Sequence, residues 1–62
     1  MEYTTSDYEE AQRALLSLIG KCEKAQTKLK EGTPQQTLLT RRIKAFYIAL
    51  SLIERKLEKE DK

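Results

Sequence analysis

The residues best suited to bind a ligand are cations and hydroxyls in the second half of the chain. No acidic residue occurs between Gly32 and Glu54, whereas Arg41, Arg42 and Lys44 fall within this stretch. In a helix, at about 100° per residue, several of these side chains share one narrow side with hydroxyls and an aromatic ring. We call these candidate ligand contacts the basic stripe, and its members are Thr37, Thr40, Arg41, Lys44 and Tyr47.

The chemistry of the basic stripe indicates binding of a small anion. Arg grips a phosphate bidentately, Lys supplies a point charge, and threonine hydroxyls complete the oxygen shell. Tyr47 or Tyr3 could stack on a base, and a helix beginning after Thr33 would add free amides and a positive dipole end. The alternative is a plain solvated helix face, and the sequence alone leaves both interpretations open.

The sequence argues against catalysis. Histidine is absent and Cys22 is the sole cysteine, which excludes zinc sites with Cys/His spacing, disulfide frameworks and histidine bases. Cys22 occupies an apolar heptad position without a neighbouring base, as a small buried hydrophobe would. The carboxylates of Asp7, Glu9 and Glu10 lack the Glu-x-x-His pattern of bundle metal sites. We therefore expect a non-enzymatic protein with no catalytic residue, no metal and no cofactor.

A first helix is predicted over residues 6–30. Ser6 and Glu9 form a Ser-x-x-Glu capping box, with Thr4 or Thr5 as alternative caps, and Gly32 provides the stop signal. Apolar residues recur at steps of three and four, which predicts a seam along this helix. The seam consists of Tyr8, Ala11, Leu15, Leu18, Cys22, Ala25 and Leu29.

A second helix is predicted over about residues 34–59, after a turn at 31–33. Thr33 is an N-cap, Pro34 suits the first helical position, and Gln36 can close a capping box. Two long helices joined by so short a turn form an antiparallel hairpin, so residues 1–62 make one structural unit. The seam of the second helix consists of Leu39, Ile43, Phe46, Leu50, Ile53 and Leu57.

The hairpin is expected to self-associate. A chain of 62 residues buries little of its surface, and the second helix carries more apolar residues than one partner helix can cover. We therefore predict an all-α fold, an antiparallel two-helix hairpin that assembles into a helical-bundle homo-oligomer. Gly20 lies on the outer side of the first helix. It marks a close contact with another molecule, marks a ligand, or is simply tolerated there, and the sequence leaves these alternatives open. The expected interface residues are Leu38, Ala45, Ile48, Ala49 and Leu52.

Charge is distributed unevenly along the chain although the net charge is only +2. Residues 1–20 carry −3, residues 21–44 carry +5 and residues 45–62 sum to zero. So small an excess, without a recognition motif, argues against a nucleic-acid partner. No run of about 18 apolar residues occurs, and the acidic, polar start differs from a secretory signal, so we expect no membrane partner and a cytoplasmic location.

Residues 33–57, TPQQTLLTRRIKAFYIALSLIERKL, resemble the second helix of small helical-hairpin proteins of phages and mobile elements. The basic and hydroxyl stretch followed by Phe46-Tyr47-Ile48-Ala49-Leu50 is more distantly similar to phage-encoded hairpin sponges that sequester cyclic nucleotide signals of host immunity. The resemblance implies an anti-defence protein that captures a small anionic nucleotide in the bacterial cytoplasm. The alternative is an interaction module whose second apolar stripe docks on a host or partner protein and inhibits it.

Overall fold

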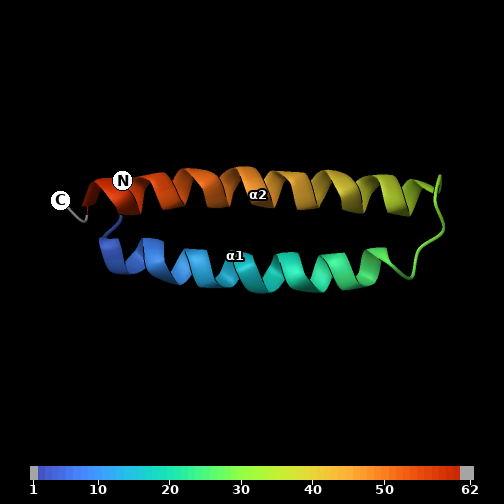
Figure 1. Cartoon of the computed structure of the whole chain (residues 1–62), viewed down its shortest axis with the longest axis horizontal. Coiled ribbons are helices and arrows are strands. Elements are labelled where there is room, and N and C mark those ends of the chain that lie inside the picture. The colour runs from blue at the N-terminus through green and yellow to red at the C-terminus, as the bar shows by residue number, and fades with distance from the viewer. Residues whose placement is uncertain (1, 61–62) are drawn as a thin grey trace.

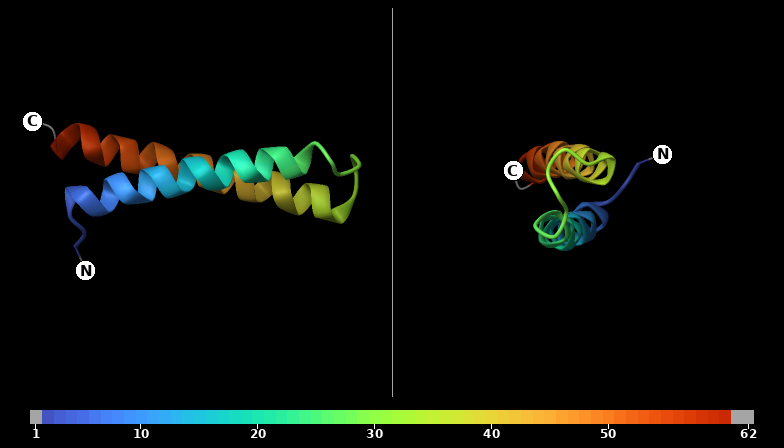
Figure 2. Two further views of the ribbon diagram at one scale, coloured as in Figure 1. Left: turned by 90° about the horizontal axis from the view of Figure 1, so that it is seen from below. Right: turned by 90° about the vertical axis from the view of Figure 1, so that its right-hand side faces the viewer.

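The computed structural model describes residues 2–60, except the side chain of Glu60, and forms one helical hairpin. Helix α1 spans Thr5–Gln26 and helix α2 spans Pro34–Glu60. The helices run antiparallel, so the start of α1 and the end of α2 lie together at the open end (Figure 1). They cross obliquely within a rod of 45 × 20 × 14 Å (Figure 2). The predicted two-helix, all-α arrangement is thus confirmed for the described residues.

The start of α1 is set by Thr4 rather than Ser6. The Thr4 Oγ1 atom accepts from the Asp7 amide at 3.1 Å, and the Asp7 carboxylate accepts from the Thr4 amide at 2.9 Å. This reciprocal pair is the capping box, and it places a negative charge at the positive helix end. The earlier cap also adds a further backbone bond, from the Tyr8 amide to the Thr4 carbonyl. Ser6 therefore lies inside the first turn, and the N-cap is Thr4, one of the two alternative caps predicted from the sequence.

Helix α1 ends at Gln26, four residues before the predicted end. The C-cap is Thr27, whose hydroxyl donates to the Lys24 carbonyl at 2.7 Å. The next two amides donate to carbonyls three residues back, at 3.1 and 3.2 Å, which tightens the chain out of the α-helix. The connection therefore covers residues 27–33 instead of 31–33. It includes Gly32 with a positive φ of 82°, a conformation that favours glycine.

The start of α2 agrees with the sequence prediction. The Thr33 hydroxyl accepts from the Gln36 amide at 3.2 Å, and the Thr33 carbonyl accepts from the Thr37 amide at 3.1 Å. Pro34 occupies the first helical position, where the missing N–H costs nothing because that amide has no helical partner. The side chains along α2 are thereby fixed in register from its first turn.

The core between the helices is thin. Within the described residues, the buried side chains are Ile19 from α1 and Ile43 and Leu50 from α2. All six residues of the seam predicted on α2 are buried or half-buried against α1. The seam predicted for this helix is therefore confirmed. The prediction succeeds because every seam position is apolar and the spacing follows the helix.

The seam predicted on α1 is partly wrong. Leu18 is 43% exposed and Ala25 is exposed, whereas Ile19 and Gln26 face α2 in their place. Leu18 and Ile19 both fit a pattern of steps of three and four, but the polar Gln26 hid the second pattern. The correction moves Leu18 and Ala25 from the core to the surface of the hairpin.

Candidate functional site

Polar contacts join the two helices along one long side of the hairpin. The Gln12 side-chain amide donates to the Glu54 carboxylate at 3.4 Å, and the Tyr47 hydroxyl donates to the Glu23 carboxylate at 2.9 Å. All four residues lie on the same side of the buried seam. We call this side of the hairpin the polar side.

Thr40 joins the helices on the polar side as well. Its hydroxyl oxygen accepts from the Gln26 side-chain amide at 2.7 Å and donates to the Gln36 carbonyl at 2.9 Å. A polar residue within the α1 seam is thus satisfied by a hydroxyl of the facing helix, as a half-buried amide requires. Thr40, predicted as a ligand contact, already holds two protein partners.

The opposite long side of the hairpin is rich in apolar residues, although Arg42 and Lys56 of α2 also lie on it. At about 100° per residue, Leu18 and Glu23 lie on opposite sides of Ile19 around α1. Leu38 and Tyr47 likewise lie on opposite sides of Ile43 around α2. Since the polar sides of the two helices adjoin, their apolar sides adjoin as well. We call this surface the apolar face, and its members are Ala11, Leu18, Ala25, Leu38, Ala45, Ala49 and Leu52.

The apolar face contains four of the five interface residues predicted from the sequence. Of these, Leu38 is 49% exposed and Leu52 is 59% exposed, Ala45 is exposed, and Ala49 is half-buried. The fifth, Ile48, is 54% exposed but lies about 60° further round α2 than Ala45, toward the cations. The sequence does not predict the contribution of Leu18 and Ala25 from α1, because both fit the heptad seam of that helix.

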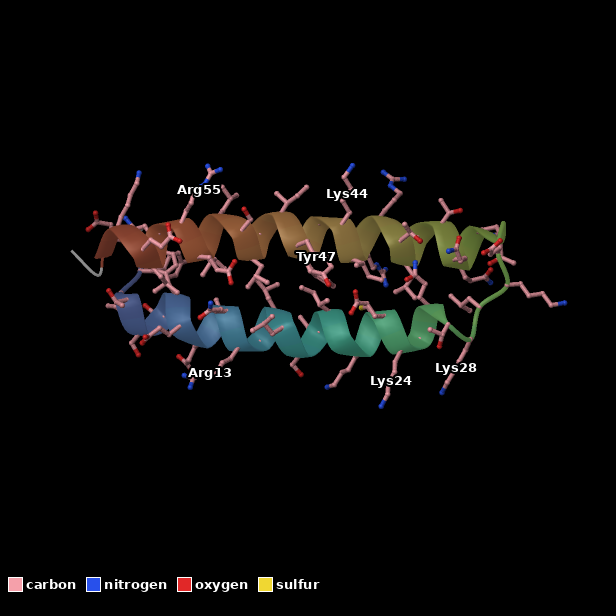
Figure 3. All side chains as sticks on the ribbon, in the orientation of Figure 1. Arg13, Lys24, Lys28, Lys44, Tyr47 and Arg55 are labelled. Carbon is pink, nitrogen blue, oxygen red and sulfur yellow. The ribbon has the colours of Figure 1, made fainter. Side chains whose placement is uncertain are left out.

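The basic stripe is divided between two directions. Thr37, Arg41 and Lys44 are exposed on the outer side of α2. Figure 3 shows Lys44 pointing away from α1, whereas Tyr47 lies between the helices. The structure therefore groups three of the five predicted contacts on one open surface and turns Thr40 and Tyr47 toward α1.

Tyr47 has an acidic neighbour that the sequence of α2 does not reveal. Its pKa is raised above the ordinary 10.0 because the neutral hydroxyl donates to Glu23, with smaller contributions from lost hydration and from the Glu23 charge. A carboxylate of α1 thus stands beside one end of the basic stripe. The cations of the stripe show no ion pair or side-chain hydrogen bond within the described part of the chain.

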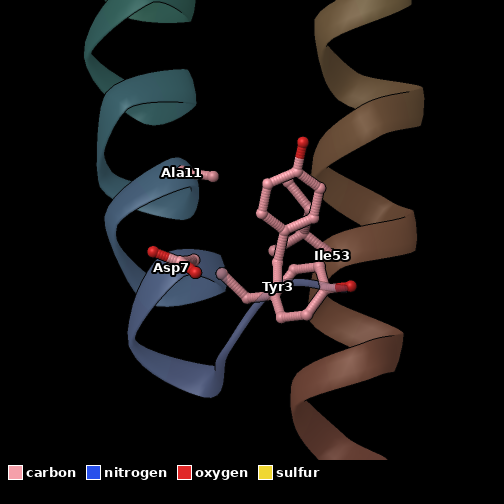
Figure 4. A pocket seen from close by; sticks show the side chains of 5 residues that line it. Tyr3, Asp7, Ala11 and Ile53 are labelled. Carbon is pink, nitrogen blue, oxygen red and sulfur yellow. The ribbon is translucent and has the colours of Figure 1, made fainter. Parts of the chain in front are cut away.

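A hollow of about 340 Å³ opens at the open end of the hairpin, beside the apolar face (Figure 4). The rings of Tyr3 and Tyr8 meet edge to face, with centroids 6.3 Å apart and planes at 75°. Ala11 and Ile53 complete an apolar lining, and Asp7 stands at the rim. The spacing of the first helix predicts Tyr8 as a seam residue, but it does not predict the hollow, because Tyr3 precedes the helix.

The described residues contain no group of three His, Cys, Asp or Glu side chains that could hold a metal ion. Cys22 is a half-buried free thiol within the α1 seam. No helix among residues 2–60 is both long and apolar enough to span a membrane. Comparison with protein-family models, curated proteins and solved structures finds no match for this chain. The arrangement offers surfaces for binding: the apolar face, the hollow and the exposed cations.

Proposed function

We propose that this chain is a non-enzymatic binding protein that works as a helical-bundle homo-oligomer and captures a small anionic nucleotide. Assembly is supported by the thin core, in which Ile19, Ile43 and Leu50 are the buried side chains of residues 2–60. Apolar surface left in water favours association roughly in proportion to its area. The apolar face is the part of the hairpin that such an assembly would cover.

The observation that supports an anionic ligand is the outward-facing row formed by Thr37, Arg41 and Lys44. These residues lie within the stretch of the chain that has a net charge of +5, and no acidic residue of α2 precedes Glu54. Exposed guanidinium, ammonium and hydroxyl groups are the donors that phosphates prefer. The likeness of residues 33–57 to phage hairpin proteins extends the proposal to sequestration of a cyclic nucleotide immune signal in the bacterial cytoplasm.

The proposal is tested by isothermal titration calorimetry with cyclic dinucleotides and inorganic phosphate as probes. The double variant Arg41→Ala/Lys44→Ala should weaken cyclic dinucleotide binding at least tenfold. Arg13→Ala/Lys21→Ala is the matched control, since it removes two exposed cations from α1 and should bind as the unmodified chain does. Circular dichroism verifies that both variants stay helical. Failure of the unmodified chain to bind any probe, or equal binding by all three proteins, would contradict nucleotide capture by these residues.

A second candidate function is docking of the apolar face on a different protein, which it would inhibit. The exposure of Leu38 and Leu52 favours this alternative, because apolar residues at helical spacing are the anchors of helix-in-groove recognition. The two functions differ in what covers the apolar face. A chain that stays monomeric at high concentration would favour the protein partner, whereas self-assembly favours the first proposal.

A further inference from the structure

The apolar face and the hollow lie next to each other and share Ala11. We propose that a second copy of this chain docks antiparallel on the apolar face, turn end against open end, with Leu38 of each copy seated in the hollow of the other. We call this antiparallel twofold arrangement head-to-tail. This inference rests on the homo-oligomer of the proposed function and adds its orientation and its central contact. It does not depend on the nucleotide.

The surface area of the hairpin indicates how much a second copy must cover. The chain exposes 5324 Å². A compact monomer of 7.2 kDa is expected to expose about 4,100 Å². The difference, roughly 1,200 Å², exceeds the roughly 800 Å² per partner that a stable interface of standard size buries. A standard interface with one further copy would therefore cover about two thirds of this excess area.

The charge distribution selects the orientation. Residues 21–44, the turn half, carry +5, whereas residues 1–20 and 45–62, the open half, carry −3 and zero. A parallel pair would set the two positive turn halves side by side, which opposes association. A head-to-tail pair sets each turn half against the open half of the other copy. Charge complementarity therefore favours the head-to-tail pair at both of its ends.

The spacing of residues on α2 fixes the register. Leu38 lies seven residues before Ala45 and Ile53 lies eight residues after it, which corresponds to about 10.5 and 12 Å along the helix. A twofold axis passing beside Ala45 therefore brings Leu38 of one copy level with Leu52 and Ile53 of the other, to within about 1.5 Å along the helix. The small side chain of Ala45 allows the two α2 helices to approach closely at that axis. Twofold symmetry then repeats the contact twice in an isologous dimer.

The hollow matches the side chain that this register brings to it. Leu38 is half exposed on the apolar face and has a compact apolar side chain. The hollow is walled by the rings of Tyr3 and Tyr8 with Ile53, and its volume of about 340 Å³ has room for a leucine. Asp7 at the rim would then face the positive turn half of the second copy. Seating Leu38 removes an exposed apolar group from water at both ends of the dimer.

Disulfide trapping tests the orientation. Single-cysteine chains Leu38→Cys and Ala11→Cys are prepared in a Cys22→Ala background, mixed, oxidised and analysed by mass spectrometry. The head-to-tail dimer predicts a disulfide between one chain of each kind, because the two cysteines must come within about 7 Å between Cα atoms. A Leu16→Cys chain is the control, because this position is more exposed than Ala11 but lies on the other side of α1, and it should not cross-link with Leu38→Cys.

Sedimentation of the same unoxidised samples separates the possible failures. A dimer mass with Leu38→Cys chains linked to each other would overturn the head-to-tail orientation while leaving the homo-oligomer standing. A monomer mass with no cross-link would overturn both the orientation and the assembly. Circular dichroism of each single-cysteine chain excludes loss of helix as the cause of a negative result.

Discussion

At the scale of single residues, Tyr47 shows how the facing helix changes the role of a side chain. On α2 alone this ring follows the cations and is a natural ligand contact, but its hydroxyl donates to Glu23 of α1 at 2.9 Å. An anion bound there would meet the charge of that carboxylate. The end of the basic stripe near Arg41 is therefore better suited to an anion than the end near Tyr47.

The contact between Tyr47 and Glu23 predicts a specific pH dependence. The pKa of Tyr47 is raised in the folded chain. The stability that this contact contributes is therefore complete below the pKa of the unfolded chain, near 10, and is lost as the pH rises through the pKa of the folded chain. Glu23→Gln should lower the pKa of Tyr47, because the hydrogen bond to a carboxylate and its charge are lost. Tyrosine absorbance titration of both proteins measures this change, with Tyr47→Phe identifying the signal. An identical Tyr47 titration in Glu23→Gln would contradict the assigned contact.

At the scale of the elements, the two glycines predict opposite responses to alanine. A Cβ atom at Gly20 would meet no atom within 4 Å, and the position is inside α1. Gly20→Ala should therefore raise the free energy of unfolding by about 0.5–1 kcal/mol, since alanine favours the helix. Gly32→Ala should lower it by about 1 kcal/mol, because φ is +82° there.

Urea denaturation followed by circular dichroism, at one fixed protein concentration, measures both changes. The pair serves as its own control, because each variant adds the same methyl group. A destabilising Gly20→Ala would instead indicate that another molecule packs closely on this part of α1, one of the alternatives that the sequence left open.

The elements also show what the sequence could predict and what it could not. The seam of α2 follows directly from the spacing of its residues, because all six positions are apolar. Thr33 and Pro34 mark the start of the helix. The seam of α1 is obscured because Gln26 lies in the core line and Leu18 outside it. The end of α1 depends on the hydroxyl of Thr27, a local contact that competes with continued helix and has no distinctive sequence signal.

The candidate site was predictable to a similar degree. Leu38 and Leu52 stand out as a second stripe on α2, but Leu18 joins them only through the pairing of the helices. The hollow depends on Tyr3, which lies outside α1 and meets the ring of Tyr8 through the path of the chain. Contacts between separate segments of this kind are set by tertiary packing rather than by periodicity.

At the scale of the whole molecule, the hairpin is a narrow rod with one apolar side and opposite charges toward its two ends. Its turn half carries +5 and residues 1–20 carry −3. Within residues 2–60 the single pair of seams buries few side chains. The proposed head-to-tail copy would cover the apolar face and pair the oppositely charged ends.

The most direct test of this account is the molar mass in solution, measured by sedimentation equilibrium for three chains. Leu38→Asp and Leu16→Asp place the same charge on leucines of nearly equal exposure, 49% and 52%, on opposite sides of the hairpin. The account predicts a dimer for the unmodified chain and for Leu16→Asp, and a helical monomer for Leu38→Asp. A monomeric unmodified chain, or a dimer that Leu38→Asp leaves intact, would contradict it.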